Sequence, residues 1–134
     1  MKTILVLDDE FPVMKLMRHL LKQYNVIETT TADEALLSSI DVNYQVDLLI
    51  ADLTVPIRSG VQVALLLRSR IPDLPVIITS GYPVSDWSGR HSADLERLGP
   101  QSLIVLQKPF SAKALLNAVC DLLPDAHVEI ARTA

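Results

Sequence analysis

Ionisable and hydroxyl side chains follow four short apolar runs at positions that apolar packing does not explain. They are Asp8, Asp9, Asp52, Thr79 and Lys108. Two carboxylates about 4 Å apart repel by roughly 4 kcal/mol at an effective dielectric of 20. A cluster of three therefore needs a cation or must take up protons. Water-accessible carboxylate oxygens suit Mg²⁺, so the pattern predicts a magnesium site if folding gathers these residues.

Phosphorylation of an aspartate requires a divalent cation beside a carboxylate, an ammonium and a hydroxyl. We expect Asp52 to be the nucleophile. The metal and Lys108 would neutralise charge on the incoming phosphoryl oxygens, and Thr79 would donate a hydrogen bond to one of them. Each residue alone is more simply explained as a helix cap or a solvated turn. The prediction rests on all of them falling at the same edge of one sheet.

The elements that would position these residues are apolar runs of β type alternating with segments of helical periodicity. The expected strands are 4–7, 25–29, 48–51, 76–79 and 103–106. Pro12 suits a first helical turn. Thr31 with Glu34 predicts a capping box. Ser111 is a plausible cap for the last helix. On the first helix, Leu16 and Leu20 are assigned to the core.

Strands that alternate with helices predict an α/β fold, a doubly wound five-stranded parallel sheet covered on both faces. Sites in such sheets lie at the carboxyl ends of the strands, which is where all the candidate residues fall. A third helix should begin near Gly60. Between 81 and 101 the pattern is rich in Gly, Pro and Ser, and only 93–98, with Ser92 as a cap, predicts a short fourth helix.

Composition restricts the class of protein. The 134 residues are 49% hydrophobic and 21% charged, which fits one globular domain, 1–124, with a tail at 125–134. A net charge of -4 offers no basic footprint for nucleic acid. No apolar run approaches the roughly 20 residues of a membrane span. Cys120 is the only cysteine, so we expect a reducing, cytoplasmic setting.

The sequence resembles the receiver domains of response regulators in two-component systems, along nearly its whole length. The resemblance is carried by Val6-Leu7-Asp8-Asp9-Glu10, by Asp47-Leu48-Leu49-Ile50-Ala51-Asp52-Leu53 with Pro56 and Gly60 downstream, by Pro75-Val76-Ile77-Ile78-Thr79-Ser80-Gly81, and by Lys108-Pro109-Phe110. Each piece is weak alone, but the ordered set is specific. The resemblance implies a CheY-like (βα)5 fold with the flavodoxin-like strand order 2-1-3-4-5.

The resemblance also implies ligands and partners. Asp9 and Asp52 would bind Mg²⁺ directly, with the backbone carbonyl of Thr54, and Asp8 largely through water. The phosphoryl donor would be a phosphohistidine on a sensor histidine kinase or a phosphotransfer protein. A cis bond would precede Pro109. The chain would be a phospho-acceptor for signal transduction and not an enzyme. The sequence does not identify its downstream protein, and it leaves open whether the chain forms a homodimer.

Two features depart from the family pattern. The family usually has Tyr or Phe three residues before the lysine, where this chain has Val105, which cannot make the inward swing of an aromatic ring. Thr79 and Lys108 are 29 positions apart, several more than usual. We hypothesise that the segment 81–105 carries the signal instead. Trp87 lies there, and we expect it to be a surface aromatic packed against its own loop, in preference to an anchor for a partner.

Other classes remain open. A receiver-fold scaffold or phosphate sink without conventional switching is the main alternative. A magnesium-dependent phosphatase would need two aspartates one residue apart, whereas Asp8 and Asp9 are adjacent. A flavin-binding protein would need a phosphate loop where Asp8-Asp9-Glu10 stands. No output domain is expected after Pro124, so we expect a stand-alone regulator or a receiver cut from a larger protein.

Overall fold

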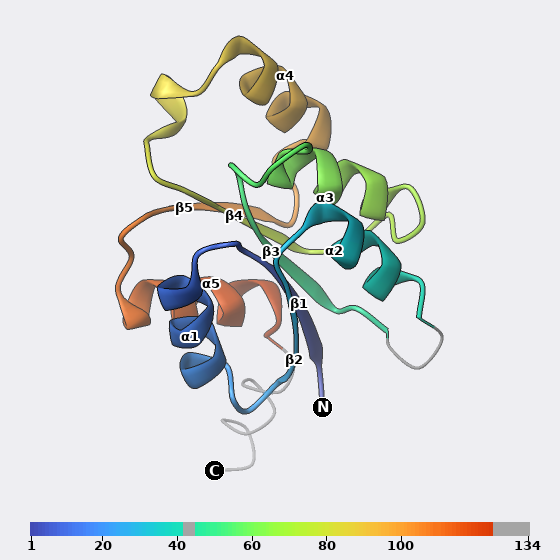
Figure 1. Cartoon of the computed structure of the whole chain (residues 1–134), viewed down its shortest axis with the longest axis vertical. Coiled ribbons are helices and arrows are strands. Elements are labelled where there is room, and N and C mark those ends of the chain that lie inside the picture. Colours follow the sequence, from blue (N-terminus) through green and yellow to red (C-terminus); the bar gives the residue numbers. More distant parts are fainter. Residues whose placement is uncertain (42–44, 125–134) are drawn as a thin grey trace.

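Five strands alternate with five helices along the chain (Figure 1). The structure is a computed structural model that describes residues 1–41 and 45–124, so the predicted tail lies outside the described residues. The elements are β1 (Thr3–Leu7), α1 (Phe11–Leu20), β2 (Asn25–Thr29), α2 (Ala32–Ser39), β3 (Leu48–Asp52), α3 (Gly60–Arg68), β4 (Val76–Ser80), the 3-10 turn η1 (Val84–Asp86), α4 (Gly89–Leu98), β5 (Leu103–Gln107) and α5 (Ala112–Leu122).

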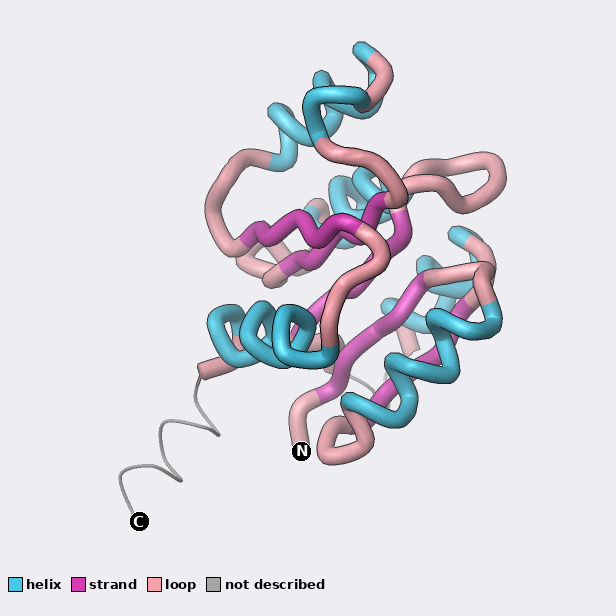
Figure 2. The backbone as a smooth tube through the Cα atoms, turned by 90° about the vertical axis from the view of Figure 1, so that its left-hand side faces the viewer, coloured by secondary structure: helices cyan, strands magenta, loops and turns pink. Residues whose placement is uncertain are grey.

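The strands form one parallel sheet in the order β2-β1-β3-β4-β5, which confirms the predicted flavodoxin-like topology. Side chains alternate between its two faces. Leu5 and Leu7 of β1 join a core with residues of α2, α3 and α4, whereas Ile4 and Val6 pack with α1 and α5. Figures 1 and 2 show the two helical layers on opposite sides of the sheet. No helix within residues 1–41 and 45–124 is long and apolar enough to cross a membrane.

Helix caps follow the predicted chemistry in most places. Thr31 and Glu34 form the capping box that begins α2, and the Ser111 hydroxyl accepts a hydrogen bond from a backbone amide of α5. Ser59 forms a further capping box with Gln62 at the start of α3. These caps satisfy backbone amides that would otherwise lack partners. They set where α2, α3 and α5 start.

Two sequence predictions on helices are wrong. The helix α4 begins at Gly89 and is capped by Ser88, four residues before the predicted start at Ala93. The first turn of α4, residues 89–92, contains no buried side chain and no large apolar one, so it lacks the apolar periodicity that marked the later turns. Leu16 is not a core residue, since 39% of it is exposed. The fully buried residues of this region are Met17 in α1 and Leu21 directly after it.

Candidate functional site

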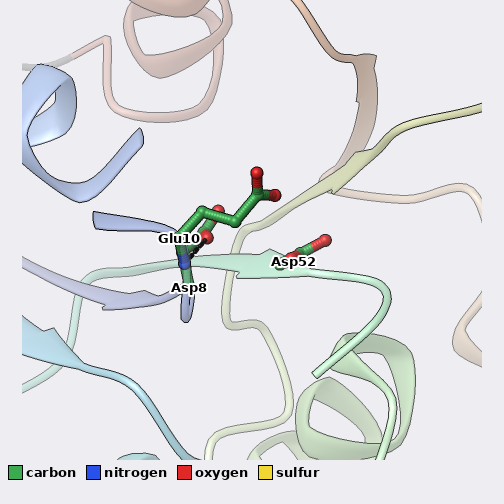
Figure 3. A group of neighbouring side chains, drawn as sticks. All are labelled: Asp8, Glu10 and Asp52. Atoms are coloured by element: carbon green, nitrogen blue, oxygen red, sulfur yellow. Dashed lines mark hydrogen bonds between the residues drawn. The ribbon is translucent and has the colours of Figure 1, made fainter. Parts of the chain in front are cut away.

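Acidic residues gather at the carboxyl ends of β1 and β3. Asp8 directly follows β1, is 1% exposed, and accepts a hydrogen bond from the Glu10 backbone amide at 2.8 Å. Oxygens of Asp8, Glu10 and Asp52 all lie within 4.8 Å of one another (Figure 3). Because β1 and β3 are parallel neighbours, their ends bring these carboxylates together from distant parts of the sequence.

Asp52 is the last residue of β3 and is buried. Its Oδ1 accepts a long hydrogen bond, 3.3 Å, from the backbone amide of Thr54. The first turn of α3 packs directly against the Asp52 backbone. A methyl group at Gly60 would collide with the Asp52 carbonyl oxygen, so this position requires glycine. The glycine thus lets α3 start beside the acidic cluster and hold Asp52 in place.

Lys108 supplies the positive charge of the site. Its Nζ lies 2.7 Å from Glu10 Oε1, 3.0 Å from Asp8 Oδ2 and 3.3 Å from Asp52 Oδ2. The Lys108–Pro109 peptide bond is cis, which confirms the prediction made from the family resemblance. The Lys108 backbone amide also donates to the Ser80 carbonyl at the end of β4. The lysine is therefore fixed at the backbone and directed into the acidic cluster.

The electrostatics follow from burial and from the close charges. Burial raises the pKa of Asp8, and Asp52 adds to the rise, although the Glu10 amide and the Lys108 ammonium act against it. Burial alone would lower the pKa of Lys108. Hydrogen bonds to Glu10 and Asp8 and the charge of Asp52 outweigh burial and raise that pKa above its usual value. The lysine therefore stays charged at neutral pH and offsets part of the carboxylate repulsion.

Thr79 lies beside Asp52 in the sheet, as the paired residue on β4. It is fully buried, and its hydroxyl has no hydrogen-bond partner among the described residues. A buried hydroxyl without a partner costs free energy, so it is a place where a bound group would be stabilised. The combination of clustered carboxylate oxygens and a donor without an acceptor fits a hard divalent cation with an oxyanion beside it.

The structure gathers Asp8, Asp52, Thr79 and Lys108, but it places Asp9 differently. Asp9 is exposed and lines an adjoining cavity of about 420 Å³ together with Thr54. Direct metal binding by Asp9 and by the Thr54 carbonyl stays a prediction. The sequence interpretation assigned no role to Glu10, the third acid of the run after β1. In the sequence, the only indication that Glu10 belongs to the acidic cluster is its position directly after Asp8 and Asp9.

The long segment after β4 folds back on the end of that strand. The indole of Trp87 donates to Ser80 Oγ at 3.2 Å and to the Tyr82 carbonyl at 3.3 Å. Trp87 is 7% exposed and belongs to the core cluster against which Val105 packs. The expected contact with its own loop is present, but Trp87 is a buried core residue and not the surface aromatic that we predicted. Trp87 also connects the segment to Ser80, the residue after Thr79.

Comparison with known proteins agrees with this geometry. The family model for the response regulator receiver domain matches residues 4–120. This chain therefore belongs to the response regulator receiver domain family, the family of regulatory domains of two-component signal transduction. A search of curated proteins finds no match.

Solved structures of receiver domains share the fold. A CheY-like receiver domain protein from Methanospirillum hungatei JF-1 is 24% identical, with a TM-score of 0.77, over 96% of this chain and 98% of that chain. The signal receiver domain of an HD domain-containing protein from Pseudomonas fluorescens Pf-5 is 22% identical, with a TM-score of 0.79, over 95% and 98%. A receiver protein from Sinorhizobium medicae WSM419 is 25% identical, with a TM-score of 0.75, over 92% and 94%.

Proposed function

We propose that this receiver domain accepts a phosphoryl group on Asp52 in the presence of Mg²⁺. The observation that carries the proposal is the convergence of Asp8, Asp52 and Lys108 beside a buried Thr79 hydroxyl that has no partner. The metal would be held by Asp52, by Asp9 and the Thr54 carbonyl, and by Asp8 through water. When bound, Mg²⁺ supplies the positive charge that lets phosphoryl oxygens approach the carboxylates.

The residues of the chain divide the work of transfer. An Asp52 carboxylate oxygen attacks phosphorus, and the bond between phosphorus and the donor's histidine nitrogen breaks as the new O–P bond forms. Lys108 exchanges a carboxylate partner for a phosphoryl oxygen, because an ammonium can pair with either anion. The Thr79 hydroxyl, which has no other partner among the described residues, donates a hydrogen bond to a second phosphoryl oxygen. The donor would be a sensor histidine kinase or a phosphotransfer protein.

Output would pass through the segment 81–105. If Thr79 shifts toward the phosphoryl group, it pulls on Ser80, and the hydrogen bond from Trp87 to Ser80 Oγ links that shift to η1 and α4. Val105 cannot act as the aromatic switch of the family, whereas the Trp87 ring already occupies the adjoining core. In this role the chain is a cytoplasmic regulator that acts on an unknown downstream protein, and not an enzyme with turnover.

Labelling with acetyl phosphate tests the acceptor. The matched control is Asp121→Asn, which alters an exposed residue of α5. We expect acetyl phosphate to label both the native chain and this control when Mg²⁺ is present, and neither when EDTA is present. Asp52→Asn should remain unlabelled in both conditions. Equal labelling of Asp52→Asn and native protein would remove Asp52 as the acceptor.

Beryllium fluoride, a phosphoryl mimic, tests the output. We expect the NMR shifts from Ser80 to Val105, including the Trp87 indole, to change when it is added with Mg²⁺. If labelling succeeds but these shifts stay unchanged, the chain is a phosphate sink or scaffold and segment 81–105 does not switch. Steady hydrolysis of p-nitrophenyl phosphate would instead favour a phosphatase.

A further inference from the structure

We infer that the groove between α3 and α4 binds an acidic, amphipathic segment of a partner protein. This inference deepens the proposed function, because it assigns a chemistry to the unknown downstream protein. The helices α3 and α4 pack side by side on one face of the sheet (Figure 1). The groove lies between them and is separate from the acidic cluster of Asp8, Glu10 and Asp52.

The groove consists of two adjoining cavities. One, of about 420 Å³, extends from Asp9 over the loop that follows β3. The other, of about 380 Å³, continues between the two helices as far as Arg97. Arg58, Gln62 and Arg90 line both cavities, so the two form one continuous surface. A bound segment would therefore reach from the phosphorylation edge of the sheet along the helices.

The groove is basic on a chain whose net charge is -4. Three of the seven arginines, Arg58, Arg90 and Arg97, line it, and all three are exposed. Of the two acids that line it, Asp94 is paired with Arg97 at 3.4 Å, and Asp9 is a proposed metal ligand. The amino ends of α3 and α4 add partial positive charge. The unbalanced charge favours an anionic partner.

Exposed apolar side chains adjoin the arginines. Ile57 is 96% exposed and lines the first cavity, and Leu66 is 40% exposed and lines the second. Arginines beside accessible apolar groups are typical of protein interfaces. Within the described part of the chain, no Phe, Tyr or Trp lines either cavity, so a nucleobase would have only the His91 imidazole as an aromatic ring to stack on. These observations favour a peptide with acidic and apolar faces over a nucleotide.

Two labelled peptides of identical length and leucine pattern provide the probe, one with glutamate and one with lysine at every polar position. Fluorescence anisotropy is measured with the full chain. We expect the glutamate peptide to bind at least about tenfold more tightly than the lysine peptide, and more weakly as salt rises. The double variant Arg58→Gln/Arg90→Gln should lose about tenfold in affinity. It keeps Arg97, so Asp94 retains its ion pair.

The matched control is Lys15→Gln/Lys113→Gln, which removes two exposed charges from α1 and α5 on the opposite layer. It should bind the glutamate peptide like the native chain. Equal affinity of the two peptides, or an equal loss in both double variants, would overturn the inference. Displacement of the peptide by micromolar ATP would assign the groove to nucleotides and overturn it too. Acetyl phosphate labelling of the same samples reports the proposed function separately.

Discussion

Removing the Lys108 ammonium should expose how strongly the acidic cluster depends on it. In Lys108→Met a side chain of similar length lacks the charge, and the buried carboxylates of Asp8 and Asp52 lose their shared cation. The Lys108 side chain is 13% exposed, against 1% for Asp8 and 3% for Asp52, so water can replace little of that interaction. The variant therefore tests whether the cluster needs a cation at all.

The expected loss is about 3 kcal/mol at neutral pH. Breaking a buried ion pair by removing one partner costs roughly 3 to 5 kcal/mol. We take the low end, because Glu10, the closest partner of Lys108, is 57% exposed and keeps its hydration. For a domain of this size, that loss lowers the melting temperature by roughly 10 °C.

The loss should depend on pH. Burial already raises the pKa of Asp8, and without the ammonium this pKa rises further. A carboxyl group whose pKa is higher in the folded state destabilises the fold only when ionised. The penalty is therefore absent below the unfolded pKa, near 3.9, and grows as pH rises through the folded pKa. The raised pKa of Lys108 contributes stability that persists through neutral pH and is lost only in strongly alkaline solution.

Thermal unfolding at pH 4.5 and pH 7.5, followed by circular dichroism with and without Mg²⁺, measures these effects. We expect Lys108→Met to be close to native stability at pH 4.5 and much less stable at pH 7.5. Mg²⁺ should stabilise the variant more than the native chain, because a bound cation replaces the missing charge. The exposed Lys113→Met serves as the control. A deficit under 1 kcal/mol at pH 7.5, or one equal at both pH values, would refute this account.

Three further changes test the contacts and backbone conformations that support the fold. Gly60→Ala should cost roughly 1 to 3 kcal/mol in chemical denaturation and slow the labelling of Asp52, whereas Gly81→Ala, with open space around it, should not slow labelling. Ile57→Gly should stabilise the chain by about 1 kcal/mol in the same assay, because Ile57 is held at φ 75° and is 96% exposed. Arg68→Met should destabilise the chain by at least about 2 kcal/mol, because the Arg68 guanidinium donates hydrogen bonds to four backbone carbonyls. An unchanged midpoint of chemical denaturation would show that these hydrogen bonds contribute nothing to stability.

The fold could be predicted from the sequence because each strand is a short apolar run bounded by turn residues. The order of the strands followed from the family resemblance. Short, fully apolar runs such as residues 48–51 are typical of central strands in a parallel sheet, and such sheets place the carboxyl ends of their strands at one edge. The prediction that Asp8, Asp52 and Lys108 converge needed only this topology. It did not need any side-chain conformation.

Other features depended on side-chain geometry that no pattern encodes. Glu10 contacts Lys108 through a long, flexible side chain, and the sequence shows only that Glu10 lies next to Asp8 and Asp9. The start of α4 was missed because its first turn has almost no apolar periodicity. Leu16 was predicted to be a core residue because it fits the helical spacing of the apolar residues in α1. In the structure, its neighbour Met17 faces the core and Leu16 is exposed.

Borohydride trapping tests the central claim most directly. Hydride reduces an acyl phosphate, and not a free carboxylate, to the alcohol, so a phosphorylated aspartate becomes homoserine. The native chain is treated with acetyl phosphate and Mg²⁺, then with borohydride, and its peptides are sequenced by mass spectrometry. We predict homoserine at position 52 only, and none when EDTA is present. Homoserine at Asp8 or Asp9, or none at position 52 despite phosphoryl labelling, would contradict the account.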